Sequence, residues 1–539
     1  MKNLRVLLTA IICFLYLNSF SQSVEMDWGQ YKKLPDNSYF QKIIGTDNDG
    51  FFTIRTAFDE STNENKFFLE YTSSTTNTME TSNELIFPTI NGILSEYEQI
   101  YYLNGKIILF SSITNQTLQN RTLYVQYLNN DGTLKNKPKN LGSIPLGNSK
   151  ADGFKIILSD NNSKILVYFN NSFVEYNNEP FNFTILDANL TELFSGELTL
   201  PLKDKKFTIE QVETGKADNF YLLAKVLSAN TKKTKTTGTN KGTENKVTDD
   251  KSKESFEYIL YVYNTKKNEL TPFNITVDKY VIKNIIFGLN TDEEIVIEGF
   301  ISNKNSKIPN EFIGAFYRKI NTKTLKPIEI DAKKSIMLFP KEFTAKFTQE
   351  RNGAPEHFYD FKINKLGFFD NGTIVMLAEQ QFVTTRTMVD PGTKEESYIY
   401  YYNYNDIICI GINKDGKLDW AIRIPKIQQG TDDYGYYSSY ALIVDANKAK
   451  IMFNDNPANE GVKDPTKMKE FATNLKTIPK ATAFMVTVYP DGSFEKDAMF
   501  PKEDAKIFLC PKLIAKSKQR NIVYGQKSNE YKFGTFAFD

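Results

Sequence analysis

The chain has 539 residues, with 66 lysines and arginines against 65 aspartates and glutamates, so its formal net charge is +1. A nucleic-acid-binding domain is expected to be strongly basic, and we therefore expect no nucleic-acid partner. Aromatic residues make up 14% of the chain, a share that suits the pleated, half-buried surfaces of β-sheets.

Residues 1–22 have the pattern of a cleaved signal peptide. Lys2 and Arg5 precede an apolar stretch from Val6 to Leu17, and small residues follow at Ser19 and Ser21. This order of charged, apolar and cleavable segments is typical of secreted proteins. No later run reaches the roughly 18 apolar residues that a transmembrane helix needs. We expect an exported monomer (periplasmic, cell-surface or extracellular) without a transmembrane segment.

From about residue 40 onward, the sequence repeats a unit of two apolar runs joined by a short polar turn, followed by two more such runs. The first half of the unit is clearest at residues 155–169, 285–300, 366–378 and 441–453. Short β-rich runs flanking Asn, Asp and Gly clusters are typical of hairpins. Four strands that recur in order at a period of roughly 50 to 80 residues resemble the blades of a β-propeller. The resemblance is to the architecture in general, and no functional family of propellers is matched.

The turn signals divide residues 23–539 into eight units, and the eighth ends after its third strand, at residues 531–539. Residues 24–34 precede the first unit and have no partner strand of their own. We predict an all-β fold: one β-propeller domain of eight four-stranded blades, with seven as the alternative. The N-terminal strand would close the last blade, which removes two exposed sheet edges.

Long insertions fall at particular places in the repeat. Residues 228–255 form a Lys, Thr, Asn and Gly tract without any aromatic residue, which predicts a disordered loop. Residues 384–397 and 455–480 also lie between the second and third strands of a unit, while 331–356 and 426–435 join successive units. In a four-stranded meander all these connections emerge on one face. Because binding residues concentrate in loops that a rigid scaffold holds, we expect the function on that face.

The densest chemical feature of the insertion face is a group of tyrosines. Five lie between Tyr398 and Tyr404, and three more follow within residues 431–437. Tyrosine offers a flat apolar ring and a hydroxyl, which suit sugar stacking or protein docking. The alternative is that these rings fill the packing between sheets. The predicted contact residues are Tyr402, Tyr404, Asp432, Asp433, Tyr434, Tyr436, Tyr437, His357 and Arg386.

His357 is the only histidine of the chain. It could act as a general base or a pH-sensitive contact, and the alternative is a structural polar residue. A single histidine excludes a site that needs two, as most zinc sites do, so no metal is predicted.

Cys409 and Cys510 stand in apolar runs and are interpreted as buried free thiols. Residues 413–420 resemble one turn-plus-tryptophan motif of quinoprotein propellers, but the chain has only two tryptophans, and no cofactor is predicted.

These observations favour an exported, non-enzymatic propeller that binds a glycan, a peptide or a protein on the face with the long loops. The alternative is a glycan-active hydrolase or lyase. It would use paired carboxylates at the channel mouth, such as Asp432, Asp433, Glu395 and Glu396, because two carboxyls about 5 to 9 Å apart suffice for glycoside cleavage.

Overall fold

The computed structural model describes residues 26–146, 153–159, 163–170, 179–201, 207–215, 219–227, 256–304, 311–328, 334–340, 343, 360–462, 464–474, 481–500, 507–517 and 520–538. Within these ranges the structure is almost entirely β, with three short 3-10 helices: η1 (Pro457–Asn459), η2 (Pro465–Lys467) and η4 (Pro511–Leu513). The predicted signal peptide (1–22), the predicted disordered insertion (228–255) and His357 lie outside the described residues. No helix of the described ranges has the length and apolar character needed to cross a bilayer.

Eight sheets of four to six strands hold most of the described strands, beside a short hairpin of β7 (Thr89–Ile90) and β8 (Ile93–Leu94). The first four sheets are β3–β6 (Ser38–Thr46, Gly50–Asp59, Glu64–Ser73, Met79–Glu84), β9–β12 (Glu96–Leu103, Lys106–Asn115, Asn120–Leu128, Lys139–Pro145), β13–β16 (Lys155–Leu158, Lys164–Asn170, Glu179–Asp187, Glu192–Leu200) and β17–β20 (Phe207–Thr214, Asn219–Leu227, Phe256–Asn264, Glu269–Ile275).

Of the other four sheets, three carry additional strands. They are β21–β25 (Tyr280–Leu289, Ile295–Asn303, Gly314–Asn321, Lys326–Pro327, Ile336–Leu338), β26–β29 with β32 (Phe361–Phe368, Ile374–Val389, Glu396–Ile412, Leu418–Thr431, Phe471–Asn474), β30, β31, β33 and β34 (Ala441–Asp445, Lys448–Asp455, Thr482–Val488, Phe494–Ala498), and β35–β38 (Phe508–Leu509, Ala515–Lys516, Asn521–Lys527, Glu530–Phe536) with β1 (Met26–Trp28) and β2 (Lys32–Lys33).

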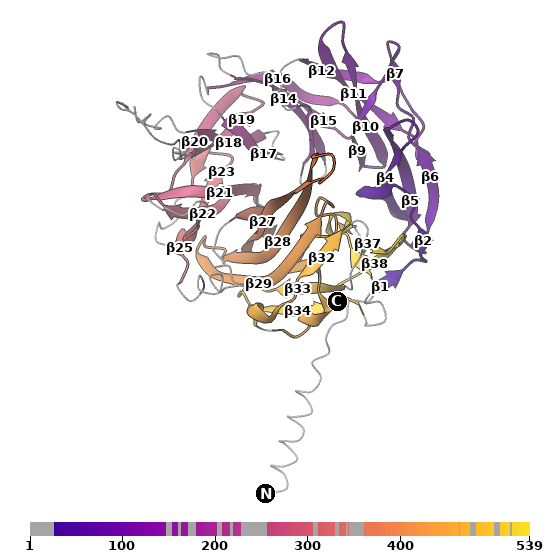
Figure 1. Cartoon of the computed structure of the whole chain (residues 1–539). Helices are drawn as coiled ribbons and strands as arrows, with labels where there is room; N and C mark the ends of the chain where they lie inside the picture. The colour runs from indigo at the N-terminus through magenta and orange to yellow at the C-terminus, as the bar shows by residue number, and fades with distance from the viewer. Residues whose placement is uncertain are drawn as a thin grey trace, which may run out of the picture.

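The sheets follow one another around a ring in chain order (Figure 1). The first strands of neighbouring sheets touch, as β3 and β9, β21 and β26, and β26 and β30 do, which places these strands innermost. Side-chain hydrogen bonds link neighbouring sheets. Gln211 exchanges two hydrogen bonds with the backbone of Phe287 (2.8 and 3.1 Å), and Asn454 does the same with Leu509 (2.8 and 2.9 Å). The predicted all-β propeller is confirmed as the fold class.

The N-terminal segment lies at the outer edge of the sheet that holds the last strands of the chain. β1 pairs antiparallel with β38, and Trp28 stands opposite Gly534. The indole of Trp28 covers this glycine closely, since a Cβ atom on Gly534 would lie 2.5 Å from a ring carbon. The carbonyl of Asp27 also accepts a hydrogen bond from Asn77 Nδ2 of the first sheet (2.6 Å). The pairing with β38 joins the two ends of the described chain, and the Asn77 contact links β1 to the first sheet.

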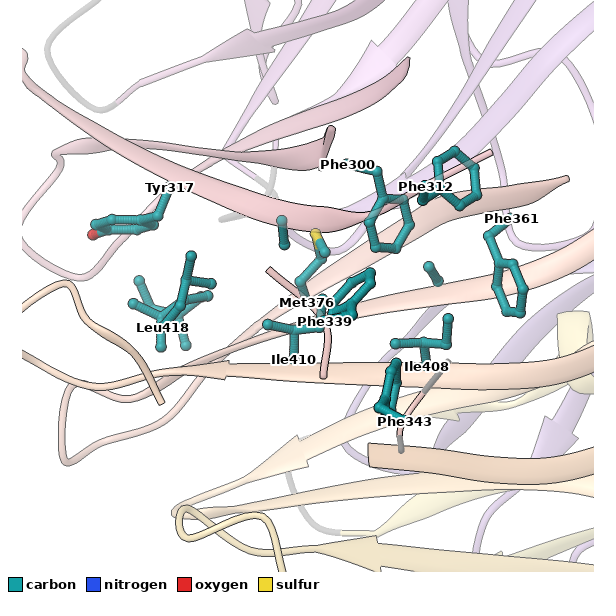
Figure 2. Packing of buried hydrophobic residues seen from close by; sticks show 14 of the residues in the cluster. Phe300, Phe312, Tyr317, Phe339, Phe343, Phe361, Met376, Ile408, Ile410 and Leu418 are labelled. Atoms are coloured by element: carbon teal, nitrogen blue, oxygen red, sulfur yellow. The ribbon is translucent and has the colours of Figure 1, made fainter. Parts of the chain in front are cut away.

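Apolar side chains from facing sheets fill the space between them. In one such cluster Phe300 and Phe312 of the fifth sheet region stack with ring centroids 4.7 Å apart, and they pack with Met376 and Ile408 of the next sheet (Figure 2). Trp420 links the sixth and seventh sheets, because its indole N–H donates to the carbonyl of Pro490 (2.8 Å). Cys409 and Cys510 are buried free thiols, as predicted.

The sixth sheet departs from the expected loop pattern. Residues 384–397 were predicted to be an insertion loop, yet β27 continues to Val389 and β28 begins at Glu396. The stretch 383–389 is rich in Val and Thr, which favour extended structure, and only residues 390–395 make the turn. In Figure 1 the joined ends of β27 and β28 reach toward the middle of the ring. The insertion is therefore a projecting hairpin of two strands.

Candidate functional site

The candidate site is the projecting end of the sixth sheet, which we call the arm. It comprises residues 381–389 of β27, 396–405 of β28 and 427–431 of β29. Both strand pairings shift register where the arm begins, between Glu379 and Gln381 and between Asn405 and Ile407. Such β-bulges bend a sheet and increase its twist. β32 pairs in parallel with β29 from Gln428 to Thr431 and widens the base of the arm.

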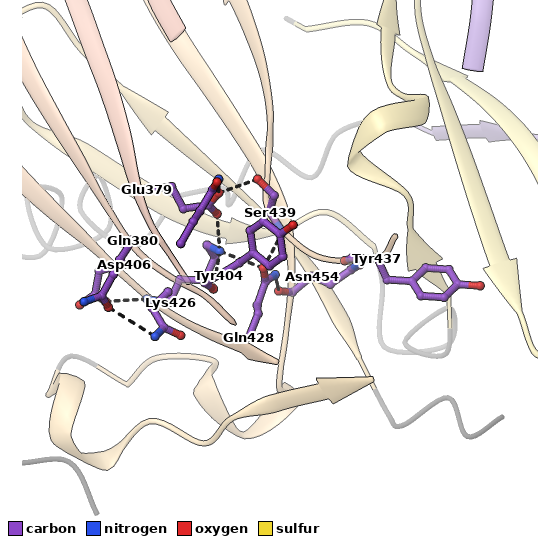
Figure 3. Close-up of polar contacts among 11 residues, drawn as sticks. Glu379, Gln380, Tyr404, Asp406, Lys426, Gln428, Tyr437, Ser439 and Asn454 are labelled. Carbon is purple, nitrogen blue, oxygen red and sulfur yellow. Dashed lines mark hydrogen bonds and ion pairs between the residues drawn. The ribbon is translucent and has the colours of Figure 1, made fainter. Parts of the chain in front are cut away.

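A buried ion pair lies at this bend. Lys426 Nζ is 2.7 Å from Glu379 Oε1, and both side chains are fully buried. Lys426 also donates to the carbonyl of Tyr404 and to Gln428 Oε1 (both 2.8 Å). Burial lowers the pKa of Lys426, and the Glu379 carboxylate opposes that shift. The other Glu379 oxygen accepts from Ser439 Oγ (2.6 Å) (Figure 3).

A second buried pair, Asp406 with Arg423, adjoins the first. Asp406 Oδ1 also accepts the backbone N–H of Lys426 (3.0 Å). Burying charges is costly, so such pairs contribute little net stability, but removing one partner leaves an uncompensated charge. The two pairs connect β27, β28 and β29 at the bend. We infer that they hold the arm in a single orientation relative to the ring.

Register places the tyrosines on one face of the arm. Tyr402, Tyr400 and Tyr398 stand opposite Val383, Thr385 and Thr387 respectively. Residues directly opposite in an antiparallel pair share a face. Tyr398 is 49% exposed, Tyr400 43% and Tyr434 76%, while half-buried Tyr402 lies beneath Tyr434, with ring centroids 5.5 Å apart. We call Tyr398, Tyr400, Tyr402 and Tyr434 the tyrosine face.

The loop after β29 brings Tyr434 onto this face. Asp432 continues the pairing, because its Oδ1 accepts the N–H of Tyr400 (2.9 Å) and its own N–H donates to the carbonyl of Tyr400 (3.0 Å). Asp432 and Tyr434 have φ values of 51° and 52°, a left-handed conformation that reverses the chain. Gly435 follows at φ 65°, and a Cβ there would lie 2.4 Å from the ring of Tyr404. Glycine is therefore required where the loop crosses that ring.

Several predicted contact residues belong to the packing instead. Tyr437 and Asp433 are buried, and Asp433 accepts from the N–H of Gly435 (2.8 Å) and from Thr473 Oγ1 (2.7 Å). Tyr436 donates its hydroxyl to the carbonyl of Phe40 (2.9 Å), and burial raises its pKa well above the usual range. Tyr437 and Asp433 are therefore part of the interior, and half-buried Tyr436 packs against the neighbouring core.

Two other predicted contact residues, Tyr404 and Arg386, lie apart from each other on the arm. Tyr404 is half-buried beside the polar network, and burial raises its pKa. Arg386 is exposed on the opposite face of the arm, across from Ile399. Of the acids considered for glycan cleavage, Asp432 and Asp433 are engaged as described above. Glu396 accepts from the hydroxyl of Tyr398 (2.8 Å). In the described ranges no group of three or more His, Cys, Asp or Glu side chains is arranged to hold a metal ion.

The sequence analysis missed the network at the bend. Its signal was a charged residue at the edge of an apolar run: Glu379 follows Val375 to Ala378, and Lys426 follows the alternating run that ends at Pro425. A charge in such a position does not reveal its partner, because Glu379 and Lys426 are brought together only by the pairing of both strands with β28.

Known proteins are similar to this chain only in structure, and at low identity. No family model matches the chain, and no curated protein matches it. Among solved structures, an ulvan lyase of polysaccharide lyase family PL25 is similar, with 10% identity and a TM-score of 0.36 over 89% of this chain and 99% of that chain. The β-propeller domain of the Trilobed protease from Pyrococcus furiosus has 10% identity and a TM-score of 0.33 over 87% and 98%. An α-L-arabinofuranosidase from Fusarium graminearum has 9% identity and a TM-score of 0.32 over 70% and 98%. These similarities concern the propeller architecture alone.

Proposed function

We propose that this chain is an exported, non-enzymatic β-propeller that binds a glycan, peptide or protein partner on the tyrosine face of the arm. Export is proposed from the N-terminal sequence pattern. We further infer eight blades, the last closed by β1 and β2. The blade count is supported by the eight sheets of the described ranges and by the pairing of β1 with β38.

The exposure of the tyrosine face is the observation that carries this proposal. Tyr398, Tyr400 and Tyr434 expose large rings to solvent, and two buried ion pairs lie at the base of the arm that carries them. Exposed aromatic rings on a rigid element lose little conformational entropy on binding, and aromatic residues are over-represented among binding hot spots. A projecting hairpin is not needed to complete the ring. Its side chains are therefore available for contact with another molecule.

The test compares three forms of the mature protein: the parent, a triple variant with Tyr398→Ser, Tyr400→Ser and Tyr434→Ser, and a control triple variant. The control changes three other exposed apolar residues to Ser: Ile86, Leu94 and Leu118, which are 67%, 64% and 68% exposed. Ligands are selected with the parent from a glycan array and a displayed peptide library. Affinities of all three forms are then measured by calorimetry.

We expect the tyrosine variant to lose at least about tenfold in affinity, because a hot-spot side chain contributes roughly 2 kcal/mol or more. Its melting temperature should match that of the control, since exposed substitutions usually change stability by less than about 0.5 kcal/mol. Equal affinity of the parent and the tyrosine variant would refute the proposal. Conversion of a selected ligand into product would refute its non-enzymatic part.

A further inference from the structure

We propose that the free edge of β27, on the side away from β28, binds an extended peptide segment of a partner protein by strand addition, with an acidic side chain of that segment beside Arg386. This inference rests on the proposed function, because it names the partner class and the binding mode for the same arm.

The edge begins where the pairing of β27 with β26 ends. Phe361 stands opposite Gln380, and the N–H of Gln381 donates to the carbonyl of Asp360 (3.0 Å), the last such bond on this side among the described residues. In the part of the chain that the structure describes, no strand pairs with residues 382–389 on the side away from β28. All of residues 383–389 are exposed.

The direction of the backbone groups follows from the neighbouring bonds. The N–H of Gln381 points away from β28, toward Asp360, whereas the N–H of Asp390 donates across the hairpin to Glu395 (2.9 Å). Directions alternate along a strand whose register is continuous, and no shift occurs between Gln381 and Val389. The N–H and C=O groups of residues 383, 385, 387 and 389 therefore point away from β28, toward the free edge. They offer an alternating row of donors and acceptors, which is complementary to another extended backbone.

This edge has few of the features that usually prevent strand pairing. Natural edge strands are protected by proline, by charged side chains (above all lysine), by bulges or by short length. Residues 381–389 contain no proline and no lysine, and their pairing with β28 has no bulge. Arg386 is the only charged residue among them. An unprotected edge of this length is a template for strand addition.

Arg386 indicates the charge of the partner. Within the described chain its guanidinium makes no ion pair, and Ile399 stands opposite it on β28. The backbone N–H and C=O of residue 386 point toward β28. An antiparallel strand added to the free edge would therefore form a non-hydrogen-bonded residue pair with Arg386, and side chains are closest in such pairs. An acidic residue at that position forms a favourable cross-strand pair. The neighbouring partner residues would lie beside Thr385 and Thr387, on the side of the arm that carries the tyrosine face.

The test uses a defined probe, the nine-residue peptide Lys-Val-Ser-Val-Glu-Val-Ser-Val-Lys, and the same peptide with lysine at its centre. Binding is measured by fluorescence anisotropy with the mature protein. Thr385→Pro removes one outward N–H and leaves the β27–β28 bonds in place, while Glu84→Pro makes the same change at the exposed outer strand β6. Two further peptides carry N-methyl groups on the two central valines or on the two serines.

We expect the glutamate peptide to bind and the lysine peptide to bind more weakly, with the preference reversed by Arg386→Glu. Thr385→Pro should weaken binding by about tenfold, the effect of one strong hydrogen bond, and Glu84→Pro should not. Valine methylation should abolish binding and serine methylation should not, because only the valine N–H groups would face β27.

Equal binding of the two methylated peptides, or unchanged binding by Thr385→Pro, would overturn the strand-addition mode. Absence of glutamate-peptide binding up to about 1 mM would also overturn it. If ligands selected on the tyrosine face still bind in that case, the proposed function stands. A concentration-dependent dimer that Thr385→Pro abolishes would assign the edge to a second copy. A lower melting temperature of Thr385→Pro, together with absence of peptide binding, would indicate that another segment of this chain pairs with the edge. Either the dimer or this result would overturn the proposal.

Discussion

Replacing Trp28 with alanine should destabilise the whole protein, because this residue secures the N-terminal strand to the last sheet. The indole packs against Phe500, with ring centroids 5.4 Å apart, and Lys532 Nζ lies 4.5 Å from its centroid. A fully buried Trp→Ala change costs about 3 to 5 kcal/mol, and a cation–π contact adds about 0.5 to 1 kcal/mol. Since Trp28 is half-buried, we expect a loss of about 2 to 3 kcal/mol.

Urea unfolding followed by circular dichroism measures this loss. Asp27→Ala is the matched control on the same strand, because the Asp27 carboxylate is exposed and its ion contact with Arg520 is long (3.5 Å). A surface pair of this kind contributes at most about 1 kcal/mol. If Trp28→Ala cost less than about 0.5 kcal/mol, the usual range of unimportant surface changes, the N-terminal strand would not be needed to complete the ring.

Three further predictions concern buried groups. Lys426→Met should cost about 3 to 5 kcal/mol, because it leaves the Glu379 carboxylate buried and unpaired, and adding Glu379→Gln should restore part of that loss in urea unfolding. Burial raises the pKa of Glu298 well above the usual range. The folded state therefore binds the Glu298 proton more tightly than the unfolded state does. The unfolding free energy should fall as pH rises above about 4.3, the pKa of an unperturbed glutamate. Glu298→Met should remove this slope, and an unchanged slope would contradict the assignment. Burial raises the pKa of Cys510 to about 12 and that of Cys409 above its usual range, so neither thiol should react with a thiol reagent at about pH 8 until the protein unfolds.

The repeated units were predictable from sequence because local signals specify them. The turn at residues 445–447 separates two apolar runs, and the structure has β30 and β31 on either side of it. The pairing of β1 with β38 agrees with the strand count, which gave the last unit three strands and left residues 24–34 without a partner. Both inferences depend on alternation and turn chemistry, which act over a few residues.

The site was predictable only in part. The alternating tyrosines from Tyr398 onward indicated a strand, but residues 384–397 were interpreted as a loop, although the Val and Thr residues among them extend β27 to Val389. Burial of Asp433 could not be predicted, because it depends on Thr473, forty residues later, and on the N–H of Gly435. Long-range pairings of this kind decide which members of a tyrosine-rich segment face solvent.

Tyrosine nitration mapped by mass spectrometry, with and without a ligand selected on the parent protein, tests the central claim most directly. Without ligand, Tyr398, Tyr400 and Tyr434 should be modified rapidly, whereas Tyr437 and Tyr221, both buried, should remain unmodified. Ligand should protect the three exposed tyrosines and leave other exposed tyrosines, such as Tyr39 (47% exposed), reactive. Unchanged modification of the tyrosine face, together with protection of tyrosines elsewhere on the ring, would contradict the account.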